Sequence, residues 1–146
     1  MMEDYNLNQL YTNKTIVSGY PRNTIFCDEE KGKETKKLLG LEDKEVYIYM
    51  PTWRGVNSYG AMRTTAIKEI LEQFDENLND NQCMFVNLHP NVGEDIDYSA
   101  FKHIDKFPVD VAKYEFINCS DALITAYSSI FFDYSITKKP IVLFMY

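Results

Sequence analysis

Four short segments of the sequence hold the side chains best suited to binding a strongly charged anion. They are Gly19–Arg22, Pro51–Arg54, Asn87–Pro90, and Tyr127–Ser129 together with Asp133. Guanidinium groups bind phosphate in a bidentate manner, and a helix that begins after two serines adds hydroxyls and free backbone N–H groups. With an imidazole and a carboxylate, these groups suit the binding of a diphosphate and the stabilisation of charge as one phosphate leaves.

The basic residues in these segments also have ordinary structural interpretations. Arg22 and Arg54, each taken alone, are typical of surface arginines. His89 stands before a proline, where an imidazole can simply hydrogen-bond a backbone carbonyl. The second histidine, His103, lies in a charged stretch and is predicted to be at the surface. The coincidence of four segments therefore argues for a site more strongly than any single residue does.

The remaining members of the set are equally open to two interpretations. Ser128 can serve only as a helix cap. Trp53 can pack in the core or form the wall of a pocket. Asp133 follows the two serines by about one helical turn and so faces back over that turn. Its carboxylate can pair with a lysine such as Lys138 or bind a ligand hydroxyl.

Strand-like and helix-like stretches alternate along the chain and define the elements that position these segments. The predicted strands are Val46–Met50, Cys83–Leu88, a short strand within Ala100–Phe107, Ala122–Tyr127 and Pro140–Tyr146. The predicted helices are Cys27–Leu39, Thr64–Leu78, Val111–Cys119 and a segment that ends near Thr137. This alternation implies an α/β fold, a Rossmann-like parallel sheet with flanking helices. The four segments fall at strand ends or sharp turns, and all of them are expected on one edge of the sheet. Ligands bind outside the carboxyl ends of strands in such sheets.

The connections and the last strand complete the prediction. Ile16–Val17 is predicted as a short strand before a turn at Gly19, and Asn57–Met62 and Val92–Tyr98 are predicted as loops. The final strand is nearly all apolar, which is typical of a parallel strand buried on both faces.

Composition narrows the functional classes. A chain of 146 residues with 45% hydrophobic residues forms one domain of ordinary size. Its formal charge of −7 argues against a general nucleic-acid binder, whose surface is basic. Cys27, Cys83 and Cys119 have no metal-ligand spacing, so they are predicted to be reduced thiols in a cytosolic protein without a metal or cofactor. No signal peptide or membrane-spanning run is present in the sequence.

Four blocks of the sequence resemble signature blocks of one family. GYPRN at 19–23, PTWRG at 51–55, LHP at 88–90 and ITAYSSIFFDY at 124–134 are similar to those of the CDP-glycerol glycerophosphotransferases, the polymerases and primases of teichoic acid and related capsule polymers. The resemblance covers roughly residues 16–146 in the family's order. It implies a GT-B-type enzyme with two Rossmann-like domains facing a cleft, of which residues 16–146 are the C-terminal, nucleotide-binding half, truncated at its end. Residues 1–15 are then a connector from a missing N-terminal domain.

The resemblance also implies a reaction and a set of site residues. The reaction is transfer of glycerol phosphate from CDP-glycerol, or from a related CDP-alditol, to a hydroxyl of a polymer acceptor with release of CMP. It implies that Arg22 contacts the CDP-alditol and that His89 stabilises charge or the leaving group. The other residues implied at that site are Thr52, Trp53, Arg54, Asn87, Leu88, Ser128, Ser129 and Asp133. The full-length protein is expected at the cytoplasmic face of the membrane, with attachment through parts outside this chain.

Two departures from the family pattern bear on the CDP-alditol. Ala126 stands where the family commonly has aspartate, and Asn87 stands where it commonly has arginine. Loss of these charges can weaken binding of the CDP-alditol or change which CDP-alditol the site prefers. Because the family's presumed general base lies in the missing domain, this chain alone is expected to bind the CDP-alditol weakly and not to turn over.

Two other functions fit parts of the same pattern. Another GT-B glycosyltransferase half, using a sugar nucleotide, would have the same serine turn and the same alternation of strands and helices. A flavodoxin-like or response-regulator-like binding domain is the non-enzymatic alternative. A response regulator needs an acidic cluster after its first strand, whereas Pro51, Thr52 and Trp53 stand there.

Overall fold

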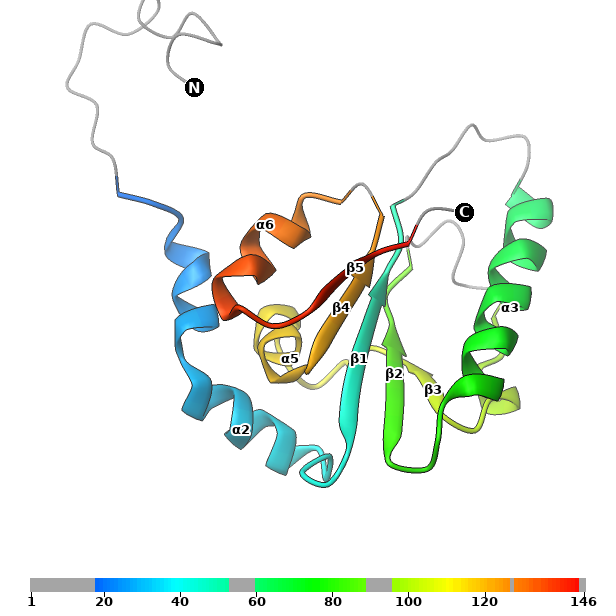
Figure 1. The fold of residues 1–146 in the computed structure, drawn as a ribbon, viewed down its shortest axis with the longest axis horizontal. Helices are drawn as coiled ribbons and strands as arrows, with labels where there is room; N and C mark the ends of the chain where they lie inside the picture. The colour runs from blue at the N-terminus through cyan, green and yellow to red at the C-terminus, as the bar shows by residue number, and fades with distance from the viewer. Residues whose placement is uncertain (1–17, 53–59, 89–95, 127, 145–146) are drawn as a thin grey trace, which may run out of the picture.

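A five-stranded parallel sheet forms the centre of the molecule (Figure 1). The computed structural model describes residues 18–52, 60–88, 96–126 and 128–144, with the side chains of 60–64 excepted. The strands are β1 (Glu45–Met50), β2 (Gln82–Val86), β3 (Ile104–Lys106), β4 (Ala122–Thr125) and β5 (Ile141–Leu143). Their order is β3-β2-β1-β4-β5 and every pairing is parallel. The predicted α/β, Rossmann-like fold is confirmed.

The helices lie on both faces of this sheet (Figure 1). They are α2 (Glu29–Leu38), α3 (Gly60–Asn77), α5 (Lys113–Cys119) and α6 (Ile130–Tyr134). Three 3₁₀ segments accompany them: η1 (Pro21–Cys27), η2 (Tyr98–Ala100) and η3 (Ser135–Thr137). The predicted strand at Ile16–Val17 lies outside the described residues.

Two apolar clusters, one on each face, hold the layers together. Ile48 and Met50 of β1 pack in one cluster with Phe116 of α5. Tyr49 points to the other face and packs with Leu71 of α3. Successive strand residues face opposite sides, so a strand between two helical layers is buried along its length. This arrangement makes β1 the central strand, and its carboxyl end sits in the middle of one edge of the sheet.

The two largest differences from the predicted helices are at the start of α3 and in the last helix. Helix α3 begins at Gly60, so residues 60–62, predicted as loop, are helical. The predicted helix ending near Thr137 is instead a five-residue α-helix followed by a 3₁₀ turn. Lys138 then has the left-handed φ of 59°, which ends the helical run before Pro140 is reached.

The last strand is exposed rather than buried on both faces. Val142 is 50% exposed and Leu143 is 59% exposed. The prediction from the apolar run is wrong for these residues because β5 is an edge strand, which pairs only with β4 among the strands that the structure describes. An apolar run indicates a strand but does not indicate its place in the sheet.

The pH dependence of stability is expected to reveal a buried tyrosine at the end of α6. Tyr134 is fully buried, its hydroxyl lies 3.0 Å from Ser120 Oγ, and burial raises its pKa to about 12. The unfolded chain releases this proton near pH 10, so stability falls as pH rises from there toward the folded pKa. By pH 11 this group lowers the free energy of unfolding by about 1 kcal/mol.

Urea unfolding from pH 8 to pH 11 measures this decline. Tyr134→Phe starts from a lower stability at pH 8, because the bond to Ser120 is lost, but declines less steeply. The same slope in the variant and the original protein would show that Tyr134 does not cause the decline.

Candidate active site

The carboxyl ends of β1, β2 and β4 end at one level, which brings three of the predicted segments to one edge of the sheet. Tyr49 is opposite Val86, and the Asn87 N–H donates to the Tyr49 carbonyl at 3.0 Å. On the other side, Met50 is opposite Thr125. The strand order reverses at β1, because β2 and β3 lie to one side and β4 and β5 to the other. Such a switch point is where open α/β sheets bind ligands.

Thr52 and Leu88 continue directly from these strand ends. Thr52 lies two residues after β1, and its Oγ1 is buried with no hydrogen-bond partner among the described residues. Asn87 and Leu88 follow β2 and are half-buried. A buried hydroxyl without a partner is costly unless something else satisfies it. The Thr52 hydroxyl is therefore a polar group at the switch point that the described protein does not use.

Ser128 and Ser129 lie where predicted, between β4 and α6, but they cap the helix only weakly. The Ile130 N–H lies 3.5 Å from Ser128 Oγ, the outer limit of a hydrogen bond. Ser129 immediately precedes α6 and makes no side-chain cap. Because α6 has only five residues, its dipole contributes less to anion binding than the predicted longer helix would. The two hydroxyls themselves remain available at this edge.

Asp133 is a buried residue at the centre of a partly buried polar cluster. Its side chain is 8% exposed, and the carboxylate accepts three hydrogen bonds from two other elements. Arg22 Nη2 donates to Oδ2 at 3.0 Å, and Asn23 Nδ2 donates to Oδ1 at 3.0 Å. The Tyr114 hydroxyl donates to Oδ2 at 3.2 Å. The sequence offered pairing with Lys138 as one interpretation of Asp133, but the ion pair of Asp133 is with Arg22.

Arg22 reaches this cluster from η1, not from the end of a strand. Its guanidinium lies 4.9 Å from the centre of the Tyr20 ring, which it covers, and its side chain is 51% exposed. The segment Gly19–Arg22 therefore joins the Asp133 cluster because η1 packs against α6 and η3. Arg22 is a surface arginine and a member of the cluster at the same time.

Asn23 and Tyr114 belong to this cluster although sequence reasoning did not select them. Asn23 directly follows Arg22 in the block GYPRN, which was the available signal. Tyr114 was predicted only as an inward-facing residue of its helix, and a buried tyrosine needs a partner for its hydroxyl. Burial and then the charge of Asp133 raise the Tyr114 pKa, so at neutral pH the hydroxyl is protonated and can donate.

Trp53, Arg54 and His89 lie outside the described residues, so their placement as site residues stays a prediction. His103, predicted at the surface, is mostly buried with a side chain that is 10% exposed. Its Nε2 lies 3.6 Å from Asp80 Oδ1, and its backbone N–H donates to Asp75 at 2.7 Å. The prediction was wrong because the charged neighbours Lys102 and Asp105 are exposed, whereas His103 stands directly before β3, where its backbone binds Asp75 of α3.

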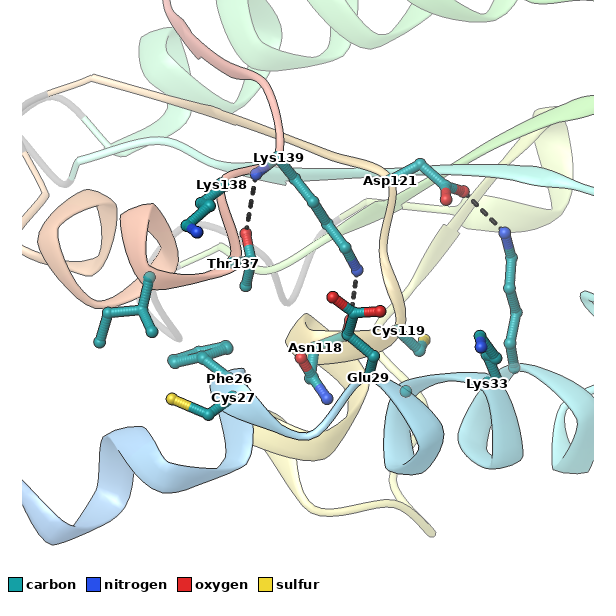
Figure 2. Close-up of a pocket in the computed structure, with 13 residues that line it drawn as sticks. Phe26, Cys27, Glu29, Lys33, Asn118, Cys119, Asp121, Thr137, Lys138 and Lys139 are labelled. Carbon is teal, nitrogen blue, oxygen red and sulfur yellow. Dashed lines mark hydrogen bonds and ion pairs between the residues drawn. The ribbon is translucent and has the colours of Figure 1, made fainter.

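A cavity of about 530 Å³ lies at the opposite, amino edge of the sheet (Figure 2). Four lysines and two acidic residues are among its lining: Lys33, Lys36, Lys138, Lys139, Glu29 and Asp121. Figure 2 shows that Lys138 and Lys139 come from the turn before β5, whereas Lys33 comes from α2. Four ammonium groups in one lining would be typical of an anion-binding cavity.

The bonds of these lysines favour a structural role instead. Lys139 Nζ donates to the carbonyls of Asn118 and Ser120, both at 2.7 Å. Lys36 Nζ lies 2.7 Å from Asp121 Oδ2, which also accepts from the Val46 N–H at 2.7 Å. These contacts fasten α2, the end of α5 and the first residues of β1, β4 and β5 to one another.

Replacing Lys139 with methionine is expected to lower the free energy of unfolding by about 1–3 kcal/mol. Two carbonyls at the end of α5 lose a charged donor that water replaces only in part. Lys138→Met is the matched control, because Lys138 is exposed and adjacent; it is expected to change stability by less than about 0.5 kcal/mol. Chemical unfolding measures both variants. An equal decrease in the free energy of unfolding for Lys139→Met and Lys138→Met would contradict the structural role of Lys139.

Neither a metal site nor a membrane span emerges from the described part of the chain. Among the described residues, no group of three His, Cys, Asp or Glu side chains is placed to hold a metal ion. Among its helices, none combines the length and the apolar composition that crossing a bilayer requires.

Comparison with known sequences places this site in a family. A family model for CDP-glycerol:poly(glycerophosphate) glycerophosphotransferase matches residues 5–146. The teichoic acid poly(glycerol phosphate) polymerase of Bacillus subtilis is 35% identical over 144 residues, covering 91% of this chain and 19% of that protein. The teichoic acid poly(ribitol-phosphate) polymerase of Bacillus spizizenii is 30% identical over 147 residues, covering 90% of this chain and 22% of that protein.

Solved structures agree with the sequence relatives. The wall teichoic acid polymerase TagF superimposes with a TM-score of 0.73 at 30% identity, covering 90% of this chain and 34% of that chain. TagF is of GT-B type, and a variant of it has been solved with CDPG. The chain spans well under half the length of these relatives. Over the part it does span, this chain belongs to the CDP-glycerol:poly(glycerophosphate) glycerophosphotransferase family.

Proposed function

We propose that this chain is the nucleotide-binding part of a transferase that moves glycerol phosphate, or another alditol phosphate, from a CDP-alditol to a polymer hydroxyl. The polymer belongs to the cell wall or capsule, and CMP is released. The observation that carries this proposal is the switch point at β1, where Thr52, Asn87 and Ser128 leave the sheet at one edge. A TagF variant solved with CDPG supports the choice of nucleotide.

The site can contribute positioning and charge stabilisation. In the proposed reaction the acceptor oxygen forms a bond to the β-phosphorus as the bond to CMP breaks in line, and CMP leaves with that electron pair. The acceptor proton passes to a base that this chain does not supply. Arg22, Thr52 and Ser128 would hold the diphosphate, and His89 would stabilise charge on the leaving group. Most of the catalysis of phosphoryl transfer comes from positioning and electrostatics of this kind.

The identity of the alditol rests on two positions at the same edge. Ala126 is 7% exposed and directly follows β4, and Asn87 directly follows β2. Neither carries the charge that the family commonly has there. Because a poly(ribitol-phosphate) polymerase is among the relatives, CDP-ribitol is the second candidate after CDP-glycerol. The enzyme would act at the cytoplasmic face of the membrane, where it meets the growing polymer.

Release of CMP by the full-length protein that carries this segment tests the proposal. CMP release from CDP-glycerol or CDP-ribitol is expected in the presence of a glycerol phosphate primer, and UDP-glucose should neither react nor compete. The segment alone should release no CMP. Reaction with UDP-glucose, and indifference to both CDP-alditols, would favour a sugar-nucleotide glycosyltransferase and contradict the proposal.

A further inference from the structure

The Asp133 cluster contains two residues with a role beyond those implied by the family blocks. We propose that Tyr114 and Asn23 are positioning residues, which hold the Arg22 guanidinium in place for the CDP-alditol by orienting the Asp133 carboxylate. This inference rests on the proposed function, because it concerns how Arg22 meets the CDP-alditol. It differs from the expectation drawn from the sequence, in which Arg22 and Asp133 bind the ligand as separate residues.

The carboxylate of Asp133 is held from two sides. Asn23 binds Oδ1 at 3.0 Å, and Tyr114 binds Oδ2 at 3.2 Å. With both oxygens fixed, the carboxylate cannot rotate without losing a bond, so the direction in which Oδ2 faces Arg22 is set. Arg22 Nη2 meets that oxygen at 3.0 Å. The position of the guanidinium therefore depends on two residues that do not touch it through hydrogen bonds.

Arg22 keeps most of its binding capacity for a ligand. A guanidinium has five N–H donors, and only Nη2 is bonded to an acceptor among the described residues. Its side chain is half exposed, whereas the carboxylate that holds it is 8% exposed. An arginine anchored at one end and open at the other is arranged to bind a phosphate with its remaining donors, since less side-chain freedom is lost on binding.

Aromatic packing completes the anchoring. The guanidinium lies over the Tyr20 ring at 4.9 Å and within 5.8 Å of the centre of the Tyr114 ring. The Tyr114 ring in turn packs on Phe26 with centroids 5.5 Å apart. Replacing Tyr114 by phenylalanine keeps both ring contacts and removes only the hydroxyl. This variant therefore separates the hydrogen bond to Asp133 from the packing of α5 on η1.

A simpler explanation is that the cluster only fastens η1 to α6 and α5, which would make Tyr114 and Asn23 structural. The two explanations differ in how Tyr114 and Arg22 depend on each other. If Tyr114 acts through Arg22, its hydroxyl matters for ligand binding only when Arg22 is present. If it is structural, its loss weakens binding by the same factor whether or not Arg22 is there.

A double-mutant cycle in the full-length protein decides between them, with CDP-glycerol affinity measured by calorimetry. We expect Tyr114→Phe to weaken Kd by about 3- to 10-fold, and Arg22→Ala by about 30- to 100-fold. In the Arg22→Ala background, Tyr114→Phe should change Kd by less than about twofold. Asn23→Ala should follow the same pattern with a smaller single effect. Tyr47→Phe is the matched control, because the Tyr47 hydroxyl also forms side-chain hydrogen bonds, with Gln82 and Glu45, but lies at the start of β1; it should leave Kd unchanged.

Equal losses in both backgrounds, or no loss from Tyr114→Phe while Arg22→Ala weakens binding, would overturn the positioning role. A protein that binds no CDP-alditol would instead overturn the proposed function. The positioning role is then tested by the NMR signal of the Arg22 Nε–H group in the same protein. Tyr114→Phe should shift or broaden this signal and Tyr47→Phe should not; an unchanged signal in both variants would overturn the inference.

Discussion

Asp133→Ala is expected to lower the free energy of unfolding by about 2–3 kcal/mol and to weaken CDP-alditol binding by at least as much as Arg22→Ala. The carboxylate is buried and accepts bonds from Arg22, Asn23 and Tyr114. Removing a buried acceptor leaves its donors without a partner. The cost stays below that of breaking a fully buried ion pair, because Arg22 is half exposed and its charge can turn to water.

Urea unfolding and calorimetric titration of one preparation measure both effects. Asp110→Ala is the matched control, since Asp110 is an exposed carboxylate between β3 and α5; its loss should change stability by less than about 0.5 kcal/mol. A change of the same small size for Asp133→Ala would mean that its three bonds contribute little. A stability loss with unchanged affinity would restrict the cluster to a structural role.

His89→Ala is expected to lower turnover of the full-length enzyme by about 10²- to 10⁴-fold while leaving the fold intact. This is the usual contribution of a side chain placed to give or take a proton in the transition state. The prediction rests on sequence position, because His89 directly follows Leu88 at the carboxyl end of β2 and lies outside the described residues.

The matched control for His89 is His103→Ala in the same protein. His103 is buried beside Asp80 at the far end of the sheet order, so its replacement should lower stability but not the turnover of the folded fraction. A loss of turnover below tenfold for His89→Ala, in protein with an unchanged unfolding transition, would remove His89 from the mechanism.

The sheet could be predicted from the sequence because local patterns determine it. The strand at Val46–Met50 and the later apolar runs are separated by helix-length segments, and this alternation alone specifies a parallel sheet. Once the sheet is parallel, Thr52, Asn87 and Ser128 must share an edge. The amino-edge cavity had no comparable signal, because Lys36, Asp121 and Lys139 meet only through the packing of α2 on α5 and the pairing of β5 with β4.

Long-range contacts explain what the sequence did not predict. The pairing of Arg22 with Asp133 spans 111 positions, and no local pattern distinguishes an arginine that stays in solvent from one that reaches a buried carboxylate. The exposure of Val142 likewise depends on which strand lies at the edge of the sheet, and the burial of His103 depends on the contact of its backbone with Asp75 of α3. Hydropathy along the chain records how apolar a strand is, and not which neighbours cover it.

A titration of the isotopically labelled chain with CDP-glycerol, followed by NMR, tests the central claim most directly. CMP, CDP-ribitol and UDP-glucose serve as the comparison ligands. We expect weak binding of a CDP-alditol with shifts at Arg22, Thr52 and Ser128, and none at Lys36 or Lys139. Shifts confined to the amino-edge cavity, or binding of UDP-glucose with no response to any cytidine ligand, would contradict it.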